Sequence, residues 1–160
     1  MENWADSTLK GMEESLKGSR EKDLRFFRIE ELQRNIRRTG EYSGQCAQCR
    51  HFKTDIQTTL KHVGEAVNVP GQYRKELDRL IARLSRHMMK SHNFYPPYYF
   101  NYLYSFYGIL AGAGVGFIAV ILAPGNRWEL IIAFIAAGLI TGQITGTRKD
   151  RIIREEKKLM

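Results

Sequence analysis

The chain has 160 residues, of which 43% are hydrophobic and 26% charged, and its formal net charge is +8. A chain of this length holds one or two small domains. It contains no nucleophile–base pair, phosphate-binding loop, paired carboxylates or dinucleotide fingerprint, so we expect neither an enzyme nor a small-molecule substrate. Acidic residues are interleaved with the basic ones and no recognition motif accompanies them, so nucleic acid is not an expected partner.

The first part of the chain predicts a small all-α domain over residues 23–95, after a polar segment over 1–22. That segment is either a weakly amphipathic helix or a mobile tail. Asp23–Arg38 has one apolar helical face and Gly40 as its natural stop, and a loop follows to Gln48. Two further amphipathic stripes, separated by the break at 69–71, predict an antiparallel helix hairpin. The apolar faces of these three helices are Phe26, Ile29, Leu32 and Ile36; Phe52, Ile56, Leu60, Val63 and Val67; and Tyr73, Leu77, Leu80, Ile81, Leu84 and Met88.

The two cysteines predict a metal site. Cys46 and Cys49 stand at the start of one helix of this hairpin, and His87 and His92 stand near the end of the other. Folding about the break brings these four side chains together, and two thiolates with two imidazoles form a usual tetrahedral zinc set. The cofactor expected is therefore a structural zinc. Two free thiols, or a redox or iron–sulfur role, are the alternatives. His51 and His62 lie off the apolar stripe, and His51 is the reserve ligand.

The second part of the chain predicts a transmembrane hairpin over residues 98–147. Its spans cover about 100–123 and 129–147, each close to the 20 residues that cross a bilayer. Glycines recur every four residues in both spans and allow close helix packing, within the chain or between copies. The pairs Gly108 with Gly146, Gly112 with Gly142, and Gly116 with Gly138 are symmetric about Arg127, so glycine should face glycine. The turn is expected at 124–127.

The distribution of basic residues predicts the topology. Eighteen lysines and arginines precede the hairpin, one lies in its turn and six lie in the tail over 148–160. The positive-inside rule then places both termini in the cytoplasm, and residues 1–10 do not resemble a signal peptide. We expect a multi-pass protein of the cell inner membrane; a mitochondrial inner membrane with matrix-facing termini is the alternative. Nine aromatic residues over 93–107 predict an interfacial belt, rather than a cofactor or quinone pocket.

These features together predict a non-catalytic integral membrane protein. The expected role is an accessory, scaffolding or regulatory subunit that presents a zinc-stapled helical domain at the cytoplasmic face. Expected partners are membrane lipids and other membrane subunits, or further copies of the chain. Two alternatives remain: a homo-oligomeric pore built on the glycine faces, and a membrane-anchored thiol redox sensor.

Overall fold

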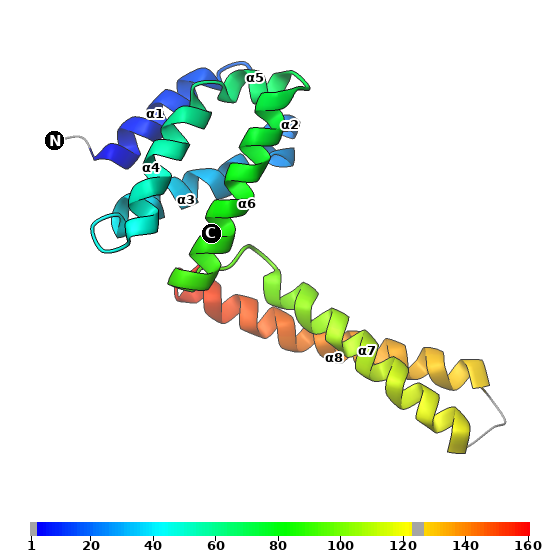
Figure 1. The fold of residues 1–160 in the computed structure, drawn as a ribbon. Helices are drawn as coiled ribbons and strands as arrows, with labels where there is room; N and C mark the ends of the chain where they lie inside the picture. Colours follow the sequence, from blue (N-terminus) through cyan, green and yellow to red (C-terminus); the bar gives the residue numbers. More distant parts are fainter. Residues whose placement is uncertain (1–2, 123–126) are drawn as a thin grey trace. The chain divides into compact units, whose positions relative to one another are not determined.

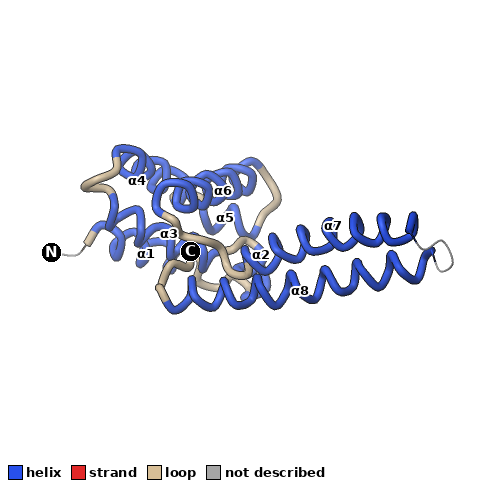
Figure 2. The backbone as a smooth tube through the Cα atoms, turned by 90° about the horizontal axis from the view of Figure 1, so that it is seen from below, coloured by secondary structure: helices blue, strands red, loops and turns tan. Residues whose placement is uncertain are grey.

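The chain is all-α, as the sequence predicts. The computed structural model describes residues 3–122 and 127–160, and in these ranges it contains eight helices and no strand, only one isolated bridge between Tyr95 and Leu159 (Figures 1 and 2). The chain divides into two compact units, which we describe separately. The six-helix unit holds the chain up to Phe94 together with Met160, and the two-helix unit holds Tyr95–Leu159.

The six-helix unit is built around the predicted apolar stripes. Its helices are α1 (Trp4–Ser15), α2 (Glu21–Phe26), α3 (Ile29–Tyr42), α4 (Ala47–Leu60), α5 (Val63–Asn68) and α6 (Gln72–His92). Leu32, Ile36 and Ile56 from the outer helices meet Leu77 and Leu84 of α6 in one core. Burial of such side chains stabilises the unit by about 1.5–3 kcal/mol each.

The polar N-terminal segment forms a helix rather than a tail. Ala5, Leu9 and Met12 of α1 are buried in the same core as α3 and α6. These three residues recur at the spacing of one helical face, so a weak apolar stripe is sufficient once a neighbouring surface covers it.

The predicted helix over 23–38 is two helices. Arg28 has a left-handed backbone, with φ of 52°, and it separates α2 from α3. Phe26, predicted on the buried face, is consequently 75% exposed. The predicted stop at Gly40 is also wrong, because α3 continues to Tyr42. A side chain at Gly40 would lie 3.1 Å from the Ala5 Cβ atom, so glycine at this position allows α1 to approach α3 closely.

The two stripes of the predicted hairpin are largely buried. The first is divided between α4 and α5, with Lys61 and His62 between the two helices, yet its apolar residues stay in the core. The second is α6, where Tyr73 is partly buried and the other stripe residues are fully buried. α6 ends at His92, and the next residue, Asn93, has a left-handed backbone (φ 57°) that commonly terminates a helix.

The two-helix unit consists of α7 (Tyr99–Leu122) and α8 (Arg127–Glu155), which pack side by side (Figure 1). By length and composition, both helices could cross a membrane. Only 11% of the positions in the apolar window of each helix are buried, unlike the core helix of a soluble protein. α8 runs on through most of the predicted tail. The expected turn residues 124–126 lie outside the described residues.

Glycines bring α7 and α8 close together, but in a register that differs from the predicted one. A Cβ atom at Gly108 would lie 2.1 Å from the Gly138 carbonyl oxygen, and one at Gly142 would lie 2.4 Å from that of Tyr104. The structure therefore pairs Gly108 with Gly138, where the sequence predicted Gly146. Gly112 faces Phe134 and Ile135, Gly116 faces Ile131, and Gly146 faces Phe100 and Asn101.

Candidate metal centre

Two helix ends bring the four predicted ligands together. Cys46 is the N-cap of α4, where its sulfur accepts a hydrogen bond from the Cys49 amide at 3.5 Å. This cap fixes Cys46 beside Cys49 in the first turn of α4. His87 and His92 lie in the last two turns of α6, which packs against α4. The chain therefore folds the cysteine pair onto the histidine pair, as the sequence predicts.

The distances fit a tetrahedral metal ion. One ligand atom from each of Cys46, Cys49, His87 and His92 lies within 4.8 Å of the other three. The His87 Nε2 atom lies 3.5 Å from the Cys46 sulfur and 3.2 Å from the Cys49 sulfur, and His92 Nε2 lies 3.3 Å from the Cys49 sulfur. Zinc–ligand bonds of about 2.0–2.3 Å in a tetrahedron imply sulfur–nitrogen separations of roughly 3.5 Å. The four residues can hold such an ion after small movements.

Neighbouring side chains orient the two imidazoles. The Ser91 hydroxyl lies 3.3 Å from His87 Nδ1, so the opposite ring nitrogen faces the sulfurs. The Tyr42 ring packs on His92 with 4.2 Å between centroids, and Phe52 packs on His87 with 5.5 Å between centroids. A hydrogen bond to the second nitrogen of a ligating histidine is the usual way that proteins fix its tautomer.

Burial gives the two thiols different acidities. Burial is the main cause that raises the pKa of Cys49 to about 12, with the hydrogen bond and the charge of Cys46 as smaller causes. The backbone N–H of Cys49 lowers the pKa of Cys46. Burial also lowers the pKa of His87 and of His92, and at His87 the charge of His92 adds to this effect. Both imidazoles are therefore biased towards the neutral form that binds metals, whereas a metal must displace the proton of Cys49.

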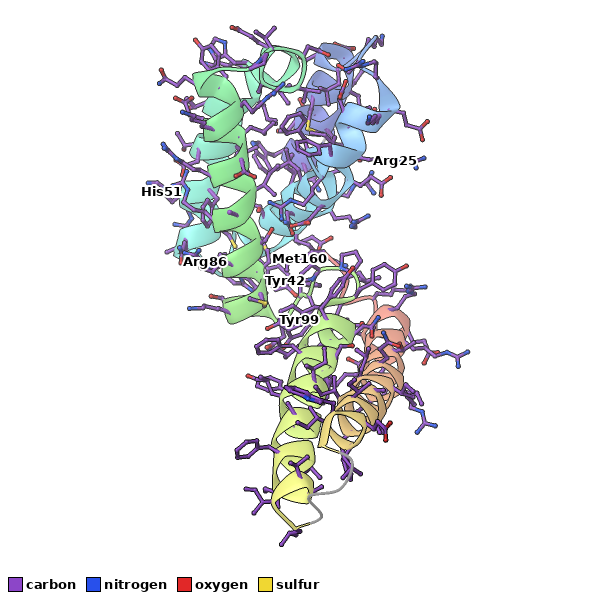
Figure 3. All side chains as sticks on the ribbon, turned by 90° about the vertical axis from the view of Figure 1, so that its right-hand side faces the viewer. Arg25, Tyr42, His51, Arg86, Tyr99 and Met160 are labelled. Carbon is purple, nitrogen blue, oxygen red and sulfur yellow. The ribbon has the colours of Figure 1, made fainter. Side chains whose placement is uncertain are left out.

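The other two histidines lie outside the cluster. His51 is exposed, with its Nδ1 atom 3.8 Å from Asp55, and His62 stacks on Tyr73 with 4.0 Å between ring centroids. Sequence reasoning missed the residues that surround the ligands. Ser91 could have been found, because it follows His87 by one helical turn. Met160, which is fully buried with Cys49, Met88 and Phe94 and lies near Tyr42 (Figure 3), has no comparable signal.

A basic groove adjoins the metal centre on the outer side of α4 and α6. Two cavities of about 590 and 520 Å³ share Asp55, Arg83 and Arg86 in their linings. Arg83 lies 3.1 Å from Asp55, but Arg86 and Lys90 have no acidic side chain within 4.0 Å in the described ranges. Figure 3 shows His51 and Arg86 on the same side of the six-helix unit. The groove therefore carries excess positive charge beside the histidine ligands.

Comparisons with known proteins find no relative of this chain. No protein-family model, no curated protein and no solved structure matches the chain. The function must therefore be inferred from the Cys2His2 cluster and the two apolar helices alone.

Proposed function

We propose that this chain is a non-catalytic integral membrane protein whose six-helix unit is held together by a structural zinc ion. The observation that carries the proposal is the ligand set itself: two sulfurs and two imidazole nitrogens, all within 4.8 Å of one another. Four protein ligands fill the coordination sphere of zinc and leave no position for a substrate or water. Such an ion stabilises a fold and performs no chemistry.

The role we propose is that of an accessory, scaffolding or regulatory subunit of a membrane complex. α7 and α8 would anchor the chain, with both of its ends on the cytoplasmic side, because basic residues dominate both flanks of the apolar helices. The six-helix unit would then face the cytoplasm. The groove beside the metal centre supports a partner that carries acidic side chains, because Arg86 and Lys90 are available to pair with them.

Metal analysis of the purified protein tests the zinc. We expect about one zinc per chain in the wild type, and its loss in Cys49→Ser and in His87→Ala, since each removes a ligand. His51→Ala is the matched control, because His51 lies on α4 outside the cluster and its loss should leave the zinc in place. A metal-free wild type, or equal loss in all three variants, would contradict the proposal.

The redox reading of the same cysteines is the second candidate. It is favoured by one observation, the lowered pKa of Cys46, because thiolates are the reactive form of cysteine. Alkylation of the native protein separates the two candidates. A bound metal protects both thiols until a chelator is added, whereas a redox sensor reacts at Cys46 with or without the chelator.

Membrane anchoring is tested independently of the metal. We expect the chain to remain in the membrane pellet after alkaline carbonate extraction, and cysteines introduced into the tail to be labelled only from the cytoplasmic side. Recovery of the chain in the aqueous fraction would show that α7 and α8 do not span a bilayer.

Crosslinking at a cysteine introduced beside Gly112 tests the alternative of a homo-oligomeric pore. A monomeric anchor gives no ladder of crosslinked oligomers, whereas a pore does.

A further inference from the structure

A half-open cavity, which the proposed function does not use, lies beside the start of α7 and the end of α8. Its volume is about 350 Å³, and its lining consists of Tyr98, Asn101, Thr147, Asp150, Arg151 and Arg154. All six residues belong to the two-helix unit. Among these residues are hydroxyl, amide and guanidinium groups, which donate hydrogen bonds to anions.

The one carboxylate in the lining is already occupied. Asp150 accepts a hydrogen bond from the backbone N–H of Phe100 at 3.0 Å with one oxygen, and from that of Asn101 at 2.9 Å with the other. These N–H groups belong to the first turn of α7, where the helix dipole stabilises negative charge. Asp150 therefore fastens the start of α7 to α8, and both of its carboxylate oxygens are already hydrogen-bonded within the protein.

The two arginines remain available for a ligand. Arg151 pairs with Glu155 at 3.4 Å, but both side chains are exposed, and exposed pairs of this kind contribute little. Arg154 has no acidic side chain within 4.0 Å among the residues that the structure describes. The two arginines and Asp150 give the lining a formal charge of +1, and the planar guanidinium group of Arg154 matches the oxygens of a phosphate.

A buried polar atom without a partner points to the same conclusion. The side-chain oxygen of Asn101 is buried and has no hydrogen-bond partner, although buried polar atoms are nearly always paired. Because Asn101 also lines the cavity, a rotation of its side chain would bring this amide to a ligand bound there.

The position of the cavity along α8 identifies the class of anion. The uncharged stretch of α8 ends at Thr147, and Arg148 begins its charged continuation. In a helix that spans a membrane, this boundary lies at the level of the lipid headgroups, where phosphates are concentrated. Tyr98, which is exposed and directly precedes α7, is the type of residue that lies at this level.

We propose that this cavity binds the phosphate headgroup of an anionic phospholipid, with Arg151 and Arg154 as the residues that contact the phosphate. The proposal rests on the proposed function in one respect, that α7 and α8 span a membrane. The bound headgroup fixes the depth at which α8 lies in the bilayer and shields the Asp150 contact with α7 from water.

Lipid titration of the full chain in a neutral detergent tests the proposal. Short-chain phosphatidylglycerol, phosphatidylcholine and inorganic phosphate are added separately, and native mass spectrometry counts the bound molecules. We expect one phosphatidylglycerol to bind in preference to phosphatidylcholine, and Arg154→Gln to weaken its binding about tenfold, the effect of losing one hydrogen bond to a charged group. Arg148→Gln is the matched control, because it removes the same charge from α8 outside the cavity.

Three results would overturn the lipid site. Equal weakening in Arg148→Gln and Arg154→Gln would show general attraction to the basic segment, and equal binding of phosphatidylcholine would show that the headgroup charge is not recognised. Displacement of the lipid by inorganic phosphate at equal concentration would assign the cavity to a soluble phosphate compound. A chain that carbonate extracts from the membrane instead contradicts the proposed function, so the two failures are distinguishable.

Discussion

The two histidine ligands make the stability of the metal-free chain sensitive to pH. The pKa of His87 and that of His92 lie below the ordinary value of 6.5 in the folded chain, because burial disfavours the charged imidazole. In the unfolded chain both return to 6.5 and bind protons first as the pH falls. Stability is therefore highest above pH 6.5, declines as the pH falls below this value, and levels off once both folded imidazoles are protonated.

Denaturation with a chelator present checks this prediction. Urea unfolding at about pH 7.5 and about pH 5.5 should show a lower midpoint at the acidic pH, with a smaller difference in His87→Gln. Trp4, one of two tryptophans, packs against the six-helix core and reports its unfolding once Trp128 is replaced by phenylalanine. Equal pH sensitivity with and without His87 would assign the effect to other groups.

Two glycines of the six-helix unit should respond oppositely to the same substitution. A Cβ atom at Gly64 would lie 2.6 Å from the Ser15 carbonyl oxygen, so Gly64→Ala must push α5 away from the end of α1. We expect a loss of about 1–3 kcal/mol, as for other overpacked sites. A Cβ atom at Gly11 in α1 would meet nothing within 4 Å, so Gly11→Ala should stabilise by roughly 0.5–1 kcal/mol. Urea unfolding, followed by Trp4 fluorescence, measures the free energy of unfolding of both variants. Equal changes in this free energy would contradict the packing of α1 on α5.

At the scale of helices, the glycines of α7 offer a similar comparison. A Cβ atom at Gly112 would lie 2.3 Å from the Phe134 carbonyl oxygen, whereas one at Gly114 would meet nothing within 4 Å. Gly112→Ala should therefore separate α7 from α8 and lower the thermal midpoint of the chain in detergent by several degrees, since roughly 1–3 kcal/mol is lost on overpacking. Gly114→Ala should leave the midpoint unchanged or slightly higher. A larger loss at Gly114 would indicate that the opposite face of α7 is the packed one.

The sequence predicts helix faces far better than it predicts helix ends. Leu32, Ile56 and Leu84 are buried because their spacing leaves them on one side of any helix that forms. The interruption at Arg28 could not be predicted, because arginine rarely adopts the left-handed backbone found there. Glycine commonly ends a helix, so the sequence predicts a stop at Gly40; it gives no sign that α1 packs against this position and that glycine is there for close packing.

The register of α7 on α8 escaped prediction for a different reason. Glycine recurs every four residues in both helices, and a repeating pattern matches itself again when one helix is moved by whole repeats. Gly108 lies opposite Gly138 instead of Gly146, which is two repeats away. The register is determined only by side chains that do not follow the repeat. Asp150 is one of them, because its carboxylate accepts hydrogen bonds from the backbone of Phe100 and Asn101 in only one register.

The metal cluster was predictable because two independent patterns converge there. The apolar stripe of α4 determines the helix face on which Cys49 lies, and the apolar stripe of α6 determines the face on which His87 lies. The break near Pro70 allows the chain to turn back, so that the second helix runs alongside the first. The surrounding shell was not predictable, because Met160 and Phe94 come from segments without any periodic pattern.

On the scale of the whole chain, metal removal should loosen one unit and spare the other. A metal held between Cys49 and His87 closes a loop across 38 residues, which in the chain-entropy model stabilises the fold by about 4 kcal/mol. We expect a chelator to speed hydrogen exchange at the start of α4 and the end of α6, and to leave α7 and α8 unchanged. Hydrogen-exchange mass spectrometry locates the effect, with His51→Ala as the control that keeps the metal. A uniform increase in hydrogen exchange along the whole chain would contradict a metal that stabilises only the six-helix unit.

The order of the ligands along the chain has a consequence for biosynthesis. Cys46, Cys49, His87 and His92 all precede Tyr99, the first residue of α7. The ribosome therefore synthesises the complete ligand set before either apolar helix, and a metal can close the six-helix unit once these residues have left the ribosome, while the end of the chain is still being translated. Met160, which packs beside Cys49, follows both apolar helices, so this side of the metal centre is covered only after they have been synthesised.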